Sequence, residues 1–412
     1  MSEAAVRIPA GFGINLVAYA DADFSLGIVA RAIAESLLRH QVPFGIVNVA
    51  HWDSAGFGNS ALASHYAGHV DEVNHPLNLY ILVQDFRNVL QSNSWLLAPG
   101  RMHVAMQWWE TTAIPPVWIE HMSRLDAIIA DSSFIANVAA NNLSQTPVIE
   151  GKYPLSLPAG IRPDRSRFGI AADATVFVTS LNPGSDPARK NPVAAVRAFR
   201  QAFSLELESV RLIVRLHKAS NNNLARSCAQ ELFRAAEDDA RISILLEPMS
   251  HAEVLSLYAS SDVFVSLHRA EGLGLGLMEA MTLGKPVIAT AWSGNMSFMD
   301  YGCGCPVRYR LMRAAGHLDF HQPDFLGPQA LWADPVLDDA VAWMRRLYQD
   351  TALRCSLGTL AKLRIDAYQA EAMKCEWIDQ LVALWRAHAF LPRVAGKYSS
   401  PPVSAPAADG LR

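Results

Sequence analysis

Short apolar runs, many of them β-branched, alternate along most of the chain with stretches of helical periodicity. A run without alternation predicts a strand that is covered on both faces. In the first half, the predicted strands are Ile14–Tyr19, Phe44–Val49, Leu79–Val83, His103–Gln107, Ala127–Ala130 and Pro147–Glu150, and the predicted helices include Leu26–Leu38 and Ser133–Ala140. In the second half, the strands are Thr175–Ser180, Arg211–Leu216, Ile242–Leu246, Val263–Leu267 and Pro286–Thr290, and the helices include Pro192–Phe203, His251–Ala259 and Leu275–Leu283. The pattern predicts an α/β protein with two doubly wound, Rossmann-like parallel-sheet domains.

The segment from Gly151 to Gly169 interrupts both periodicities with three prolines, as is typical of a linker between domains. We expect an N-terminal domain, a linker, a C-terminal domain, a C-terminal helix that could cross back to the first domain, and a disordered tail, over 1–152, 153–168, 169–364, 365–392 and 393–412. Ligands of such sheets bind beyond the carboxyl ends of the strands. Two facing domains would therefore hold a ligand in the deep cleft between them.

Composition narrows the class of protein. With 51% hydrophobic and 18% charged residues, the chain has ample material for buried cores and is not disordered. A net charge of −4 argues against a dedicated nucleic-acid binder. No apolar run reaches the roughly 18–20 residues of a membrane span. The N-terminus also lacks the layout of a signal peptide. We expect a cytoplasmic protein, with peripheral contact at the inner face of the membrane left open.

The densest chemical signal runs from Ser266 to Asn295 and reads as strand, glycine-rich turn, helix, turn and strand. Its three alternate glycines are Gly272, Gly274 and Gly276. Without Cβ atoms, such a turn can lie against a ligand, and the N-terminus of the following helix suits a phosphate. Glu271 stands at the turn and Glu279 in the helix, where its carboxylate could accept both hydroxyl hydrogen bonds of a ribose. The alternative is a glycine-rich turn followed by a glutamate on the helix surface.

Basic residues follow the first strand of the second domain. Arg189 and Lys190 come just before a helix that opens with Pro192. They could neutralise a diphosphate leaving group, on which negative charge develops in the transition state. The alternative is an exposed basic pair at a loop tip. His268 and Arg269 end a strand directly before Glu271, so they are expected to face the cleft, although a buried structural histidine is an equal expectation.

Glu271, seven residues and then Glu279, followed by Ala280-Met281 and the run from Gly284 to Ala289, resemble the E-x7-E signature of retaining glycosyltransferases of family 4, which have the GT-B fold. The resemblance implies that Glu271 positions the donor sugar near the reacting centre and that Glu279 binds the nucleotide ribose. It also implies that the turn and its neighbours bind the donor, namely Gly272, Leu273, Gly274, Leu275, Gly276, His268 and Arg269.

Lys190 matches the lysine with which this family stabilises the departing diphosphate. The family also places an arginine at the end of the preceding strand. Here the strand ends Ser180-Leu181-Asn182, so the resemblance leaves open whether Arg189 takes the place of that arginine.

The first domain carries weaker signals. Ser25 and Gly27 follow the first strand and should lie on the acceptor side of the cleft. Another strand ends at Trp108, Trp109 and Glu110, which places two aromatic side chains and an acid at the cleft edge. There an aromatic face could stack on a sugar and a carboxylate could bind hydroxyls. The segment resembles the Trp-Glu segment of one bacterial subgroup of the family. Alternatively, the tryptophans belong to the core and Glu110 caps a helix. The D-x-D triplet Asp21-Ala22-Asp23 is interpreted as coincidental.

The resemblance predicts a retaining transferase that moves a hexose from a nucleotide diphosphate sugar to a hydroxyl of a saccharide or lipid-linked saccharide. It further implies a role in surface polysaccharide or lipopolysaccharide assembly, with no cofactor and no essential metal. Two alternatives stay open: a nucleotide-sugar epimerase or hydrolase on the same fold, and a non-catalytic sugar-nucleotide-binding subunit. The base, the sugar, the acceptor, the general base and the oligomeric state are not specified by the sequence.

Overall fold

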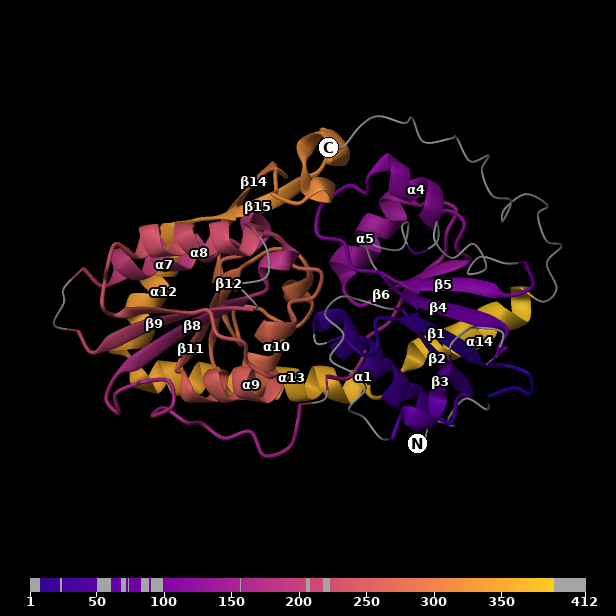
Figure 1. Cartoon of the computed structure of the whole chain (residues 1–412), viewed down its shortest axis with the longest axis horizontal. Coiled ribbons are helices and arrows are strands. Elements are labelled where there is room, and N and C mark those ends of the chain that lie inside the picture. The colour runs from indigo at the N-terminus through magenta and orange to yellow at the C-terminus, as the bar shows by residue number, and fades with distance from the viewer. Residues whose placement is uncertain are drawn as a thin grey trace.

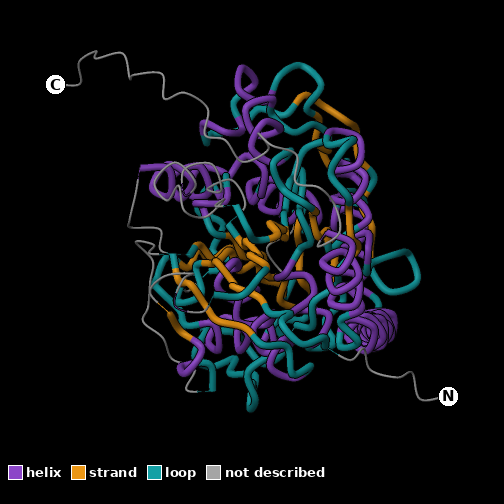
Figure 2. Tube along the Cα trace, turned by 90° about the vertical axis from the view of Figure 1, so that its right-hand side faces the viewer, coloured by secondary structure: helices purple, strands orange, loops and turns teal. Residues whose placement is uncertain are grey.

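Two α/β domains lie side by side in the computed structural model (Figure 1). The structure describes residues 8–22, 24–49, 61–67, 72, 74–82, 89, 99–155, 157–204, 208–217 and 223–388. In an orthogonal view, strands gather toward the interior and helices lie around them (Figure 2). Both sheets are parallel throughout the described residues, which confirms the prediction of two doubly wound domains.

The first sheet has the strand order β3-β2-β1-β4-β5-β6-β7. Its strands are β1 (Ile14–Ala18), β2 (Phe44–Asn48), β3 (Tyr66–Ala67), β4 (Leu77–Ile81), β5 (Met102–Met106), β6 (Ala127–Ala130) and β7 (Val148–Glu150), and its helices are α1 (Ser25–Arg39), α4 (Pro116–Met122) and α5 (Ser133–Asn142). Every residue of β1, β4, β5 and β6 is buried. Burial on both faces explains why these strands read as unbroken apolar runs.

The second sheet has the order β10-β9-β8-β11-β12-β13. Its strands are β8 (Thr175–Leu181), β9 (Val210–Leu216), β10 (Ile242–Leu245), β11 (Val263–Ser266), β12 (Val287–Thr290) and β13 (Cys305–Val307). Its helices are α6 (Pro187–Lys190), α7 (Pro192–Ala202), α8 (Asn223–Ala236), α9 (His251–Ser260), α10 (Leu275–Thr282) and α12 (Leu337–Gln349). Because β8, β9 and β11 run parallel, their carboxyl ends lie at one edge, which faces the first domain.

An antiparallel hairpin that the sequence pattern does not predict extends from the second domain. It consists of β14 (Tyr309–Arg313) and β15 (Leu331–Pro335), joined by a segment with a 3-10 turn (Asp319–His321) and α11 (Pro323–Leu326). We call residues 309–335 the arm; in Figure 1 its two strands lie at the upper edge of the second domain, on the side toward the first.

The tip of the arm contacts the first domain. The backbone N–H of Thr112 donates to the carbonyl of Leu331 at 3.2 Å, and the Thr112 hydroxyl accepts from the Leu331 N–H at 2.9 Å. The Trp118 ring packs against Phe320 and Phe325, with centroids 6.2 and 5.9 Å away. The arm therefore forms one of the connections between the domains.

The C-terminal region differs from the single helix expected over 365–392. It forms α13 (Thr351–Ala372) and α14 (Glu376–His388), separated at Cys375, whose φ is +50°. In Figure 1, α13 runs along the second domain toward the first, and α14 continues along the first domain. Although α13 has 22 residues, no helix in the described part of the chain is apolar enough to span a membrane. The expected tail over 393–412 lies outside the described residues.

Packing fixes α14 on the first domain. The rings of Trp385 and Phe12 meet edge to face at 5.5 Å. Trp377 is 1% exposed and packs on Gly151, where a Cβ atom would lie 3.1 Å from the tryptophan Cβ. Helix α14 is therefore part of the first domain's core.

We expect Trp377→Ala to destabilise the protein by about 3–5 kcal/mol, because it removes a buried aromatic side chain and leaves a cavity beneath α14. Equilibrium urea unfolding measures this loss. The control is Leu363→Ala on α13, whose residue is 59% exposed and should change stability by no more than about 0.5 kcal/mol. A loss for Trp377→Ala as small as that of the control would contradict the packing described here.

Candidate active site

A cavity of about 430 Å³ lies between the domains. From the first domain and the linker it is lined by Phe24, Ser25, Leu26, Ile28, Val29, Trp108, Glu110 and Tyr153. From the second domain and the arm its lining includes Ser180, Leu181, Asn182, Ser185, Arg189, Lys190, Arg215, His217, Met249, His251, Tyr258, Ser266, Glu271–Leu277, Glu279, Phe320 and His321. The cleft is therefore at the carboxyl ends of the second sheet's strands, where ligands of such sheets bind.

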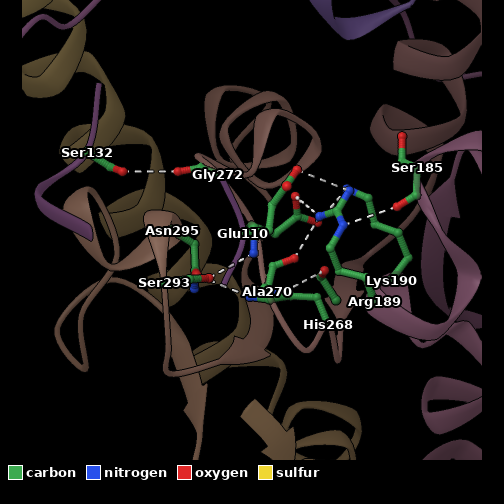
Figure 3. A network of polar contacts seen from close by, with 12 residues as sticks. Glu110, Ser132, Ser185, Arg189, Lys190, His268, Ala270, Gly272, Ser293 and Asn295 are labelled. Atoms are coloured by element: carbon green, nitrogen blue, oxygen red, sulfur yellow. Dashed lines mark hydrogen bonds and ion pairs between the residues drawn. The ribbon is translucent and has the colours of Figure 1, made fainter. Parts of the chain in front are cut away.

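Two cations and two carboxylates meet in this cleft (Figure 3). The Lys190 ammonium donates to Glu271 Oε1 at 2.6 Å. The Arg189 guanidinium lies 3.5 Å from Glu271 Oε2 and 3.6 Å from Glu110 Oε1. It also donates to the Ala270 carbonyl at 2.8 Å. Since Arg189 is 4% exposed and Glu110 comes from the first domain, the pair is no exposed loop tip; it joins the two domains.

The charged groups of this cluster and their burial shift one another's pKa values. Burial opposes ionisation of Glu271, but Lys190 and then Arg189 outweigh it and lower the pKa of this carboxyl to about 2. Burial is also the largest influence on Arg189, yet Glu110 and Glu271 raise the pKa of the guanidinium. For Lys190, burial prevails over the attraction of Glu271 and lowers the pKa. An anionic ligand that approached Lys190 would compete with Glu271 for it.

The short helix α6 presents both cations. Asp186 precedes it with φ +68°, and the Asp186 carboxylate accepts from the Ala188 N–H at 2.9 Å. Asn191 follows it with φ +50°, and its side-chain amide donates to the Leu267 carbonyl at 3.0 Å. Left-handed backbone is unfavourable for such residues unless their surroundings hold it. These two anchored residues therefore fix where Arg189 and Lys190 lie.

Hydrogen bonds with a neighbouring chain segment fix the glycine-rich turn. The Glu271 N–H donates to the Ser293 hydroxyl at 2.8 Å, and the Gly294 N–H donates to the Glu271 carbonyl at 2.9 Å. A Cβ atom at Gly294 would lie only 1.8 Å from the Gly272 carbonyl oxygen, so this approach requires glycine. The first domain also contacts the turn, since the Ser132 hydroxyl donates to the Gly272 carbonyl at 3.0 Å.

The predicted donor-binding residues of the turn line the cleft, from Gly272 through Leu273, Gly274 and Leu275 to Gly276. Gly274 has φ +99° and immediately precedes α10. The turn thus brings backbone and the start of a helix to the cleft, as its glycines predict.

Glu279 is 5% exposed, so it is not a helix-surface residue. Its carboxylate pairs with His251 Nε2 at 2.6 Å. Tyr258, whose hydroxyl has a pKa raised by burial and by Glu279, lines the same part of the cleft. The histidine and the tyrosine come from α9, a helix in which the sequence shows no chemical motif.

Arg215 and His217 also line this part of the cleft and were not predicted. Arg215 lies opposite Ser180 in the parallel register of β8 and β9. Its guanidinium is 2.9 Å from His217 Nδ1. The signal that could have identified them is that β9, like β8, ends in polar residues at the same edge of the sheet.

His268 and Arg269 do not line the cleft, contrary to expectation. The His268 ring is wholly buried between the Ser266 hydroxyl at 2.9 Å and the Asn295 side chain at 3.1 Å, and burial lowers its pKa. Arg269 binds Asp334 of the arm at 3.0 Å and donates to the Ala188 carbonyl at 2.6 Å. The structural expectation for His268 is therefore the correct one.

Of the residues predicted in the first domain, some line the cleft and others do not. Ser25 and Glu110 line the cleft, but Trp109 and Gly27 do not. Trp109 is 3% exposed and its indole N–H donates to the Ala113 carbonyl, so it is a core residue. At Gly27 a Cβ atom would lie 2.1 Å from the Ala22 carbonyl oxygen, which makes the glycine a packing requirement.

Of the two tryptophans expected at the cleft edge, Trp108 lines the cleft and Trp109 does not. Its indole N–H donates to the carboxylate of Asp131. Burial raises the pKa of that carboxyl to about 8, against the effect of the tryptophan hydrogen bond. Asp23 of the D-x-D triplet lies outside the described residues.

Residues 184–301 match the model of the family described as glycosyl transferases group 1. The predicted resemblance is thereby confirmed at the level of the group. The segment covers α6 and α10, and with them Arg189, Lys190, Glu271 and Glu279.

Among curated proteins, the chain is 25% identical over 136 residues to the GtfA subunit of the UDP-N-acetylglucosamine–peptide N-acetylglucosaminyltransferase of Streptococcus gordonii. The match covers 31% of this chain and 27% of the relative, so the chain matches about a quarter of that protein's length.

Solved structures resemble the whole fold. A sucrose-phosphate synthase from Thermosynechococcus elongatus has a TM-score of 0.65 at 15% identity, with 91% of this chain and 100% of that chain covered. Anabaena HepE in complex with UDP and glucose has a TM-score of 0.59 at 14% identity, with 90% and 100% covered. These similarities confirm the GT-B fold.

The Glu271 cluster predicts a dependence of stability on pH. The pKa of about 2 in the folded protein lies below the ordinary 4.5, so the unfolded chain takes up the proton first as pH falls. The stabilisation by ionised Glu271 is therefore present above about pH 4.5 and is lost progressively toward pH 2. We expect the difference in unfolding free energy between wild type and Glu271→Gln to shrink by roughly 1.4 kcal/mol per pH unit below about pH 4.5. Urea unfolding at a series of pH values tests this, and a constant difference would contradict it.

Proposed function

We propose that this protein is a retaining glycosyltransferase of family 4, which transfers a hexose from a nucleotide diphosphate sugar to a hydroxyl of a saccharide or lipid-linked saccharide. The observation that carries the proposal is the cluster of Lys190, Arg189 and Glu271 in a cleft that Glu279 also lines. The group 1 match supports it, as does the similarity to HepE, a protein that binds UDP and glucose.

The donor would lie along the cleft with its nucleotide toward Glu279. This buried carboxylate is suited to the two ribose hydroxyls, and His251 orients it at 2.6 Å. The diphosphate would then lie near Lys190 and Arg189, with the backbone of Gly274–Gly276 beside it. Glu271, at the other end of the turn, would position the sugar.

During transfer, the bond between the anomeric carbon and the diphosphate oxygen breaks, and negative charge accumulates on the leaving group. Lys190 and Arg189 would stabilise that charge more strongly in the transition state than in the bound donor. The acceptor hydroxyl forms the new bond on the face from which the diphosphate leaves, so the departing phosphate can take up its proton. No protein general base and no metal ion are part of the proposal.

The end of β8 lacks the family arginine, which is the best argument for a non-catalytic sugar-nucleotide binder. Arg215 supports the catalytic interpretation. It lies opposite Ser180 on the neighbouring strand, is 7% exposed and lines the cleft, so a guanidinium reaches the same edge of the sheet from β9.

The acceptor would approach from the first domain, where Ser25, Trp108 and Glu110 line the cleft. Glu110 is 3.6 Å from Arg189, which would bring an acceptor hydroxyl bound to it close to the diphosphate. A role in surface polysaccharide or lipopolysaccharide assembly is part of the proposal.

Binding of UDP, GDP and ADP and their common sugar conjugates, with and without EDTA, tests the donor site by thermal shift. At 100 times its dissociation constant, a ligand should add about 2.7 kcal/mol of stability. We expect one nucleotide family to bind, EDTA to have no effect, and Glu279→Ala to weaken that binding at least tenfold. The control is Glu371→Ala, whose side chain is 52% exposed. An unchanged affinity in Glu279→Ala would refute the ribose role.

Lys190→Ala should separate catalysis from binding. We expect a loss in turnover on the order of 100-fold or more, because the ammonium acts mainly on the charge of the transition state. Release of the nucleotide diphosphate from the donor, with and without octyl and p-nitrophenyl glycosides as acceptors, measures it. Lys362→Ala, with a side chain 51% exposed, is the control. Undiminished turnover would refute the phosphate role, and donor consumption that ignores every acceptor would favour the hydrolase or epimerase.

A further inference from the structure

His321 reaches the cleft from the arm. It ends the 3-10 turn Asp319–His321, is 1% exposed and lines the cleft beside Phe320. Neither the group 1 segment, which ends at residue 301, nor the sequence patterns include it.

A buried carboxylate fixes the imidazole. His321 Nδ1 lies 2.9 Å from Asp186 Oδ2, and the same carboxylate accepts from the backbone N–H groups of His317 at 2.8 Å and Leu318 at 3.1 Å. Burial opposes the charge of Asp186, but the hydrogen bonds from His321 and the backbone outweigh it and hold its pKa well below the usual range. Nδ1–H therefore donates to an ionised carboxylate, which sets the orientation of the ring.

The second ring nitrogen has a different environment. Nε2 is buried and has no hydrogen-bond partner among the residues that the structure describes. The rings of Trp109, Phe320 and Trp332 surround the imidazole, with centroids 6.2, 4.6 and 6.1 Å away. A buried polar atom without a partner is unfavourable. Because Nδ1 faces Asp186, Nε2 is the remaining polar atom of this residue that lines the cleft.

We propose that His321 binds a sugar hydroxyl in the cleft through Nε2, with Asp186 as the residue that positions it. An imidazole that donates through Nδ1 keeps a lone pair on Nε2, which accepts a hydrogen bond from a hydroxyl. Aromatic faces at Phe320 and Trp108 line the same cleft and suit the C–H surface of a sugar. Asp186 also precedes α6, so the sugar contact and the phosphate-binding cations share one support.

This inference rests on the proposed function and names a further sugar-binding residue for it. The hydroxyl belongs either to the donor sugar or to the acceptor, and two substitutions with different reach distinguish a ligand contact from a structural role. His321→Asn places an amide N–H where Nδ1 lies, so it retains the bond to Asp186 and loses Nε2. His321→Gln places its amide where Nε2 lies and loses the bond to Asp186.

The first measurement is calorimetric binding of UDP, UDP-glucose and UDP-N-acetylglucosamine, or of the corresponding set if wild type prefers another base. The second is transfer to octyl and p-nitrophenyl glycosides. If the hydroxyl is the donor's, we expect His321→Asn to weaken binding of the nucleotide sugar at least fivefold and to leave binding of the free nucleotide unchanged. We expect His321→Gln to recover part of the lost affinity. If it is the acceptor's, both affinities stay unchanged and KM for the acceptor glycoside rises at least fivefold in His321→Asn.

The proposal is overturned if His321→Asn equals wild type in both measurements, or if His321→Gln is the more impaired variant, since either result assigns the histidine only to support of the arm. A failure of the proposed function looks different, because wild type itself would then bind no nucleotide and no nucleotide sugar.

Discussion

The burial of Arg189, with the partly buried Lys190 beside it, is the constraint on which the cleft depends. Charges taken out of water are tolerated only when opposite charges and hydrogen bonds compensate them. Glu271 compensates both cations from the glycine-rich turn, and Glu110 compensates Arg189 from the other domain. The relative placement of the two domains is therefore tied to the charge balance of the site. An anionic ligand that reached Lys190 would compete with Glu271 for the ammonium, so under the proposed function donor binding would perturb the cluster.

Contacts of the backbone support this charge cluster. The Gly272 carbonyl receives the Ser132 hydroxyl from the first domain, and Trp108 packs so closely that a Cβ atom at Gly272 would lie 3.0 Å from it. On the other side, Gly294 allows a second chain segment to approach the same carbonyl. A turn enclosed in this way keeps its shape without a ligand, which lowers the entropy lost when one binds.

Local patterns predicted the parts of the molecule that depend on local contacts. Buried strands such as β6, over Ala127–Ala130, follow from unbroken apolar runs, and the spacing of Glu271 and Glu279 follows from one turn and one helix. The arm could not be predicted, because Leu331 finds its partner at Thr112, far away in the sequence. His268 shows the opposite error. Its place next to Glu271 suggested a cleft residue, but the direction of its side chain is set by Ser266 and Asn295.

In the described residues, the domains are connected on two sides of the molecule in addition to the contacts within the cleft. The helix α13 leads from the second domain into α14 on one side of the molecule, and the arm meets Thr112 and Trp118 on the other (Figure 1). Two domains that are connected only by a hinge can rotate apart, whereas a second connection resists that rotation. The domains can separate on this side only after the hydrogen bonds between Thr112 and Leu331 and the aromatic contacts of the arm are broken. Under the proposed function, the strength of these contacts between the arm and the first domain would govern how long a closed complex lasts. Residues of the arm that take no part in the reaction would then influence the rate of product release.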